Sequence, residues 1–111
     1  MRCWTTLLLP LWVSAALLAG TASGADQVSP ARQAELRHLV LQDCGSCHGM
    51  TMKGGLGSPL LPADLVDLAE ESIVQIILDG VPGKPMPPWR GLLSESEAEW
   101  IAKALKTGVV K

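Results

Sequence analysis

Apolar residues recur at intervals of three and four positions in three stretches of this chain, the period expected of one face of an α-helix. The first stretch follows Ser29 and Pro30, which suit the N-cap and the first position of a helix. The sequence therefore predicts a first helix that begins at Pro30 and leads into Cys44. Its predicted inner face comprises Leu36, Leu39, Val40 and Cys44.

The same periodicity predicts two further helices. One runs from about Glu70 to Asp79, with Gly80 placed to end it. The other begins with a capping box at Ser94–Glu97, runs to about Lys106 and stops before Gly108. A short helical segment is expected within 62–68. The expected buried residues of the two longer helices are Ile73, Ile76 and Ile77, and Ala98, Ile101, Ala102 and Leu105.

Two ordered loops, rich in glycine and proline, separate these helices. The segment 49–62 contains six glycines and prolines, and the segment 80–89 contains four prolines and two glycines, so neither can form a long helix or strand. The second loop is therefore stiff, and it holds one methionine, Met86. Leu56, Leu60 and Leu61 of the first loop are expected to line a pocket.

The first 25 residues form a separate unit. A positive start at Met1–Arg2, an apolar run at Leu7–Leu18 and small residues up to Ala25 are typical of a cleavable secretory signal peptide. The run is too short to favour a membrane anchor. We therefore expect residues 1–25 to be removed and residues 26–111 to form one exported domain, with no membrane association afterwards.

The remaining chain is mildly acidic, because loss of Arg2 leaves eight Lys and Arg against eleven Asp and Glu. A nucleic-acid-binding domain would need a basic patch, and the sequence has none. A domain of about 86 residues is also marginal for a self-supporting core. With no Phe or Tyr in the chain, few aromatic side chains are available to fill the interior.

The strongest chemical signal is the run Cys44-Gly45-Ser46-Cys47-His48. C-x-x-C-H is the attachment motif of c-type haem, in which the two thiols add to the haem vinyl groups and the histidine ligates the iron. No second cysteine pair is present to complete a zinc site. The alternative is an exported binding module held by a Cys44–Cys47 disulfide.

Met86 is the candidate for the second axial position of the iron, because its proline-rich segment has little freedom to lose on binding. Met50 and Met52 follow His48 too closely to reach the other side of the ring. With His48 and Met86 both bound, no substrate can coordinate, and the expected activity is electron transfer rather than enzymatic catalysis. The alternative is an open-site haem enzyme or gas sensor in which Met86 only packs.

Other residues have expected roles around the pocket. The carbonyl of a residue near Pro59 is expected to accept the second imidazole N–H of His48. Trp89 either fills the core or donates its indole N–H to a haem propionate. Lys53, Lys84 and Arg90 flank the two loops, either as a docking ring for redox partners or as scattered solvated charges.

The order of these motifs resembles the small class I cytochromes c over nearly all of residues 26–111. The resemblance implies an all-α fold of three to four short helices wrapped round one covalent haem c, with the first and last helices crossing. It assigns Cys44 and Cys47 to the thioethers, His48 and Met86 to the iron, and the Pro59 carbonyl to the imidazole. Aromatic residues usual at the helix crossing are replaced here by Val40 and Ala104, with Leu36 expected to fill the space.

A narrower resemblance involves the sequence around the haem motif, with Lys53-Gly54-Gly55-Leu56-Gly57, and the segment Pro85-Met86-Pro87-Pro88-Trp89. It is similar to the small periplasmic cytochromes encoded with haem-d-type nitrite reductase in denitrifying bacteria. This implies a periplasmic monomer that passes electrons to nitrite reductase, or that takes part in maturation of its haem d.

Overall fold

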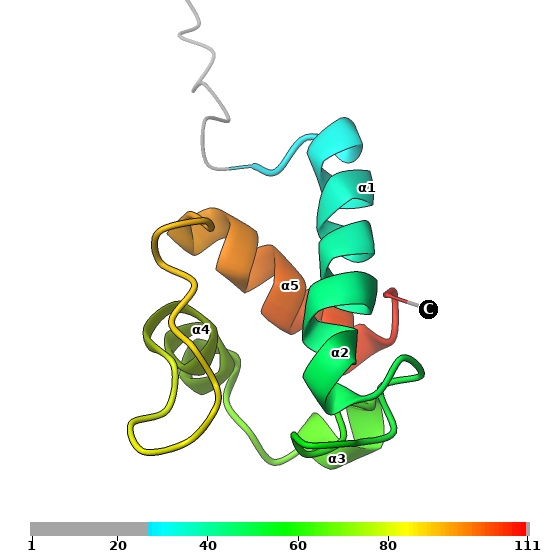
Figure 1. Ribbon diagram of the computed structural model, residues 1–111. Helices are drawn as coiled ribbons and strands as arrows, with labels where there is room; N and C mark the ends of the chain where they lie inside the picture. The colour runs from blue at the N-terminus through cyan, green and yellow to red at the C-terminus, as the bar shows by residue number, and fades with distance from the viewer. Residues whose placement is uncertain (1–26, 111) are drawn as a thin grey trace, which may run out of the picture.

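The computed structural model describes residues 27–110, so the predicted signal peptide at 1–25 lies outside the described residues. All regular structure within 27–110 is helical, as predicted for an all-α fold. The elements in chain order are α1 (Pro30–Leu39), η1 (Val40–Cys44), α2 (Gly45–His48), α3 (Pro62–Leu65), α4 (Glu70–Asp79) and α5 (Glu95–Thr107). Figure 1 shows α1 and α2 as one column that crosses α5, with α4 beside α5 and away from that column.

The first helix begins where the sequence predicted, because the Ser29 side chain accepts a hydrogen bond from the Arg32 backbone N–H and Pro30 follows it. It continues beyond Leu39 into a π-helical turn, η1. The Gly45 N–H there donates to the carbonyl of Val40, five residues earlier. This wide turn inserts one extra residue before α2. Simple helical periodicity could not reveal it.

Helix α4 has the predicted bounds, but its predicted buried face is partly wrong. Ile73 is buried, Ile77 is half-buried, and Ile76 is 39% exposed. The buried positions on this helix also include Val74 and Leu78. The buried face of α4, which packs against α5, is therefore rotated from the predicted one: it includes Val74 and Leu78 and leaves Ile76 exposed.

Helix α5 confirms its prediction closely. The capping box is present: the Ser94 hydroxyl accepts from the Glu97 N–H, and the Glu97 carboxylate accepts from the Ser94 N–H. Gly108 ends the helix in the left-handed conformation, with φ 74°. All four predicted inward residues are buried, and Ala104 joins them.

The buried core is shared by α1, η1, α3, α4 and α5 and includes the crossing of α1 with α5. Leu36, Val40 and Ala104 are all buried, so the crossing is built from aliphatic side chains as the sequence predicted. Trp100 of α5 is partly buried against this core, and its ring centroid lies 5.4 Å from the Arg37 guanidinium of α1. The terminal helices are therefore joined by small aliphatic side chains and by one cation–π pair.

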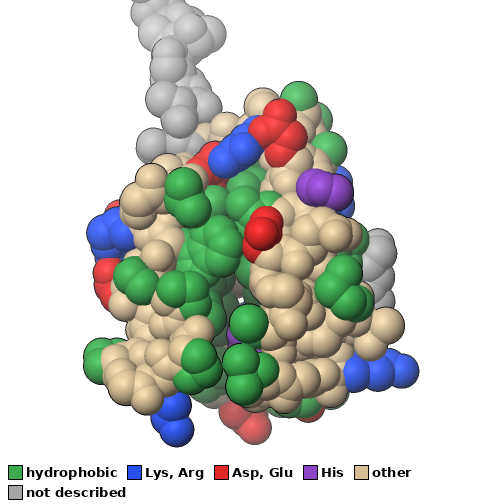
Figure 2. Space-filling view, viewed as in Figure 1, with side chains coloured by type: hydrophobic (Ala, Val, Ile, Leu, Met, Phe, Trp, Pro, Cys, Tyr) green, Lys and Arg blue, Asp and Glu red, His purple; other side chains and the backbone are tan. Residues whose placement is uncertain are grey.

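Figure 2 shows hydrophobic side chains gathered in a hollow between the α4 side and the α1–α2 side of the molecule. The charged side chains visible on this face lie around its edge. No helix within residues 27–110 is both long enough and apolar enough to cross a membrane.

An ion pair joins the two crossing helices near their N-termini. The Arg32 guanidinium contacts the carboxylates of Glu97 at 2.6 Å and Glu35 at 2.7 Å. Hydrogen bonds from Arg32 and from the Ser94 backbone lower the pKa of Glu97. The ionised form of Glu97 is therefore favoured by folding.

Glu97→Gln should destabilise the protein by about 0.5 kcal/mol at pH 7, the usual worth of such an ion pair, because glutamine can still accept the Ser94 N–H but no longer pairs with the charge of Arg32. Because folding lowers the pKa of Glu97, its ionised form contributes stability above the pKa of the unfolded chain, and this contribution is lost as pH falls through the folded pKa. The wild type and Glu97→Gln should thus converge in acid. Thermal unfolding of both from neutral pH downward measures this, with exposed Glu99→Gln on the same helix as control; a pH-independent difference would contradict it.

Candidate functional site

The C-x-x-C-H motif spans the end of η1 and the whole of α2. Cys44 is the last residue of η1, and Cys47 and His48 close α2. Both cysteines are free and half-buried, so the disulfide of the alternative interpretation is not formed. Burial, with a smaller contribution from Asp43, raises the pKa of the Cys44 thiol to about 11, which keeps it protonated at neutral pH.

The His48 imidazole is oriented by the loop that follows it. Its Nδ1 lies 2.6 Å from the Ser58 carbonyl oxygen. Because a carbonyl oxygen can only accept, Nδ1 carries the proton and donates it, which leaves the lone pair of Nε2 free for a metal. This is the tautomer that an iron-ligating histidine requires.

The partner of His48 corrects one prediction. The resemblance assigned the accepting carbonyl to Pro59, whereas the structure places the carbonyl of Ser58, one residue earlier, against the ring. The Pro59 ring instead lies 3.3 Å from where a Cβ on Gly54 would stand. Pro59 therefore packs the loop, and the Gly-Ser-Pro sequence located the feature without resolving which carbonyl is used.

Glycines of the loop allow it to wrap closely around the motif. The Gly57 N–H donates to the Cys47 carbonyl, and the Gly54 N–H donates to that of His48, both at 2.8 Å. A Cβ on Gly57 would lie 2.6 Å from His48 Cε1, closer than side-chain contacts permit. Gly57 thus keeps one side of the imidazole free of a side chain, a role that sequence reasoning did not assign.

The two rival methionines lie on the α2 side, as predicted. A Cβ on Gly45 of α2 would lie 3.4 Å from both the Met50 Sδ and the Met52 Cε. Met52 is buried in the core, whereas Met50 is 56% exposed. Leu60 and Leu61 pack against the core, but Leu56, expected to line the pocket, is 75% exposed.

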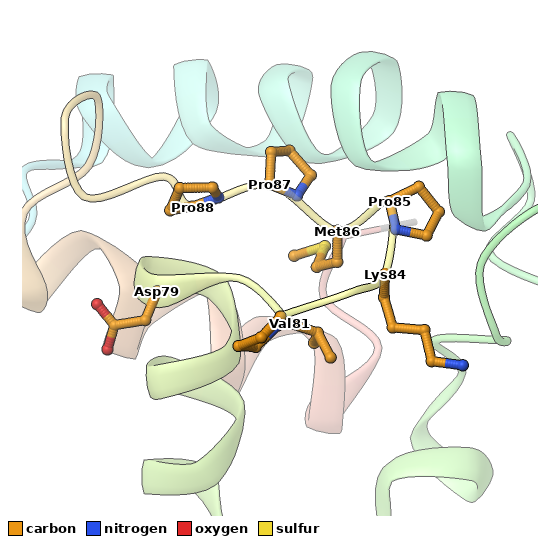
Figure 3. A pocket seen from close by; sticks show the side chains of 8 residues that line it. Asp79, Val81, Lys84, Pro85, Met86, Pro87 and Pro88 are labelled. Carbon is orange, nitrogen blue, oxygen red and sulfur yellow. The ribbon is translucent and has the colours of Figure 1, made fainter.

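Met86 lies in a loop that borders a hollow of about 340 Å³. Its side chain is half-buried, and Figure 3 shows it directed back over the loop while Lys84 extends away. The hollow is lined by Asp79, Val81, Pro82, Lys84, Pro85, Met86, Pro87 and Pro88.

Trp89 and the flanking cations complete the second loop. Trp89 is half-buried and packs against the core, and its backbone N–H donates to the Ile77 carbonyl. Arg90 contacts the Asp79 carboxylate at 2.8 Å, and this hydrogen bond lowers the pKa of Asp79. Arg90 is therefore partly neutralised, while Lys53 and Lys84 are exposed.

The residues present fit a covalently bound haem. Two free thiols lie one helical turn apart, directly before an imidazole whose Nε2 lone pair is available. Figure 2 shows a hydrophobic hollow between the α4 side and the α1–α2 side of the molecule, and Figure 3 shows the Met86 thioether on the loop after α4. Cysteine thiols, imidazole and thioether are the groups that c-type cytochromes use for haem attachment and ligation.

Comparisons with known proteins agree with this chemistry. The family described as cytochrome C oxidase, cbb3-type, subunit III matches residues 31–103. Cytochrome c55X of Paracoccus denitrificans (strain Pd 1222) is 57% identical over 80% of this chain and 85% of its own length. Cytochrome c55X of Pseudomonas aeruginosa PAO1 is 48% identical over 90% and 87%.

Two solved structures share the fold. One described as c-type cytochrome NirC has a TM-score of 0.73 and 51% identity, covering 75% of this chain and 98% of that one. The second is described as dihydro-heme d1 dehydrogenase NirN in complex with DHE. It has a TM-score of 0.58 and 33% identity, covering 62% of this chain and 15% of that one. This chain therefore belongs to the monohaem c-type cytochromes, in the family that includes cytochrome c55X, and carries one covalently attached haem c.

Proposed function

We propose that this protein is a periplasmic one-electron carrier of the nitrite reductase system, with its haem held by Cys44 and Cys47 and its iron ligated by His48 and Met86. The observation that carries the assignment of His48 is its Nδ1 contact to the Ser58 carbonyl, which leaves Nε2 for the iron. The proposal for Met86 rests on its place in the proline-rich loop and on the resemblance to class I cytochromes c. The signal-like segment 1–25 supports export to the periplasm.

The haem supplies a reversible one-electron couple, and the residues of this chain influence its reduction potential. His48 is held in one tautomer, and a neutral thioether at Met86 favours ferrous iron, which raises the reduction potential. With both axial positions taken, no substrate reaches the metal, so we propose a carrier rather than an enzyme or gas sensor.

The nitrite reductase link rests on the sequence resemblance and on the names of the relatives. The segments around Cys44–Gly57 and Pro85–Trp89 resemble the cytochromes encoded with haem-d-type nitrite reductase. The structural relative of 51% identity is called NirC. We therefore propose that the reduced protein delivers electrons to nitrite reductase.

A second direction of electron flow is favoured by one observation. Part of the protein described as dihydro-heme d1 dehydrogenase NirN shares the fold of this chain at 33% identity. A dehydrogenation releases two electrons, so a monohaem acceptor would have to be reduced twice per reaction. In this alternative the oxidised protein accepts electrons during maturation of haem d.

Stopped-flow mixing separates the two directions. Reduced protein mixed with oxidised nitrite reductase should be oxidised rapidly if it is the donor. Oxidised protein mixed with the dehydrogenase and its dihydro-haem substrate should be reduced if it serves maturation. Failure of both reactions would contradict a role in this system.

Met86→Ala should retain the covalent haem but lose the sulfur-to-iron charge-transfer band near about 700 nm. Its reduction potential should fall by about 100 mV or more, within the ~0.8 V range that axial ligands span. Optical spectra and redox titration measure both effects, and carbon monoxide should bind to the ferrous variant at once. Exposed Met50→Ala is the matched control. An unchanged band in Met86→Ala would show that Met86 only packs, as in the open-site alternative.

Gly57→Ala should disturb the histidine side of the haem, because its Cβ would lie 2.6 Å from His48 Cε1. We expect a displaced imidazole, a partly high-spin ferric spectrum and lower thermal stability. Gly91→Ala is the control, since a Cβ there meets nothing within 4 Å. Identical spectra for both variants would mean that Gly57 does not set the ring position.

Two exposed lysines, Lys53 and Lys84, lie in the loops 49–62 and 80–89, and neither loop contains an Asp or Glu. We propose that they steer an acidic redox partner. Replacing both with Gln should lower the rate of electron transfer to the partner about tenfold at low salt and flatten its salt dependence. Lys103→Gln, on the exposed face of α5, should have little effect. Equal losses in both variants would indicate a general charge effect.

A further inference from the structure

The loop that carries Met86 leaves and re-enters the molecule at the same point, the C-terminal end of α4. The last carbonyls of a helix have no partner within the helix. Here the Gly80 N–H donates to Ile76, and the Trp89 and Arg90 N–H groups donate to Ile77 and Leu78, at 2.9, 3.1 and 3.1 Å. The two ends of the loop are therefore fixed by the free end of one helix.

Gly80 stands at the centre of this arrangement. Its φ of 69° and ψ of −168° belong to a region that is essentially restricted to glycine. A Cβ on Gly80 would lie 2.6 Å from the Met86 carbonyl oxygen and 2.9 Å from both the Pro87 carbonyl carbon and the Pro88 nitrogen. The backbone of residues 86–88 thus rests directly on the Gly80 α-carbon.

The same carbonyl of Met86 has a second contact from this side. The Val81 N–H donates to it at 3.1 Å, and the Lys84 N–H donates to the Val81 carbonyl at 3.1 Å. The backbone of Met86 is therefore hydrogen-bonded to the residue that follows the end of α4. The position of this backbone determines where the Met86 side chain begins.

From these contacts we infer that Gly80 is a positioning residue for the thioether of Met86. This inference rests on the proposed role of Met86 as the iron ligand. Any side chain at position 80 must push the Met86 carbonyl away from α4. Pro85 and Pro87 fix φ on either side of Met86, so the loop has little freedom to absorb that shift, which reaches the thioether.

The test uses purified holoprotein, in which the haem remains covalently attached. Gly80→Ala should weaken the charge-transfer band near about 700 nm. It should also bind imidazole, a competing iron ligand, at least tenfold more tightly than wild type. Gly80→Asn is a second variant, because it adds the same Cβ with a different side chain, and this φ/ψ region does not favour asparagine over alanine.

Gly83→Ala is the matched control. Gly83 lies in the same loop and also has a positive φ, 74°, but a Cβ there meets nothing within 4 Å. It therefore adds backbone strain without a contact to Met86. A normal band and normal imidazole affinity in Gly83→Ala, together with the changes in the Gly80 variants, would support the inference.

Three outcomes would overturn it. Equal effects in Gly80→Ala and Gly83→Ala would attribute them to backbone strain alone, and wild-type behaviour of both Gly80 variants would show that the contact does not matter. Collapse of both Gly80 variants would make Gly80 a requirement for folding as a whole. Met86→Ala in parallel separates the two proposals, because retention of the band in that variant removes the ligand assignment itself.

Discussion

The hydrogen bond from His48 Nδ1 to the Ser58 carbonyl is the constraint on which the site depends. It fixes the tautomer, the ring orientation and the free nitrogen of the one imidazole in the haem motif. The loop can make this contact only because its glycines let the backbone lie against α2. Gly57 approaches the ring so closely that a side chain there would displace it. The chemistry of the motif is thus set by backbone geometry in the next segment of the chain.

The loop 80–89, which carries Met86, is also positioned by glycine and proline residues. Its methionine is carried by a proline-rich segment whose ends are bonded to the last carbonyls of α4. Gly80 lets that segment return against the helix end without a side chain in between. In both loops, glycine supplies close approach and proline supplies stiffness. For the proposed ligands His48 and Met86, such stiffness favours a geometry that changes little between oxidation states, as one-electron transfer requires.

Helices α1 and α5 form the frame to which these two loops are attached. Leu36, Val40 and Ala104 close the crossing of α1 and α5 with small aliphatic contacts, and the ion pair of Arg32 with Glu97 ties the helices near their N-terminal ends. Family membership then follows from the motif and from relatives at 48% and 57% identity. The proposed redox partner rests instead on the names of the relatives and on the exposed Lys53 and Lys84.

The sequence by itself determined the helix starts, the helix ends and the haem chemistry, because each depends on local rules. Ser29–Pro30, the Ser94–Glu97 capping box, Gly80 and Gly108 act on neighbouring backbone groups, and C-x-x-C-H has a fixed spacing. Tertiary structure decided the π turn before α2, the choice of Ser58 over Pro59, the exposure of Ile76 and the pairing of Arg90 with Asp79. These features depend on which segments meet in space, and a one-residue change of register or a loop contact leaves no periodic trace in the sequence.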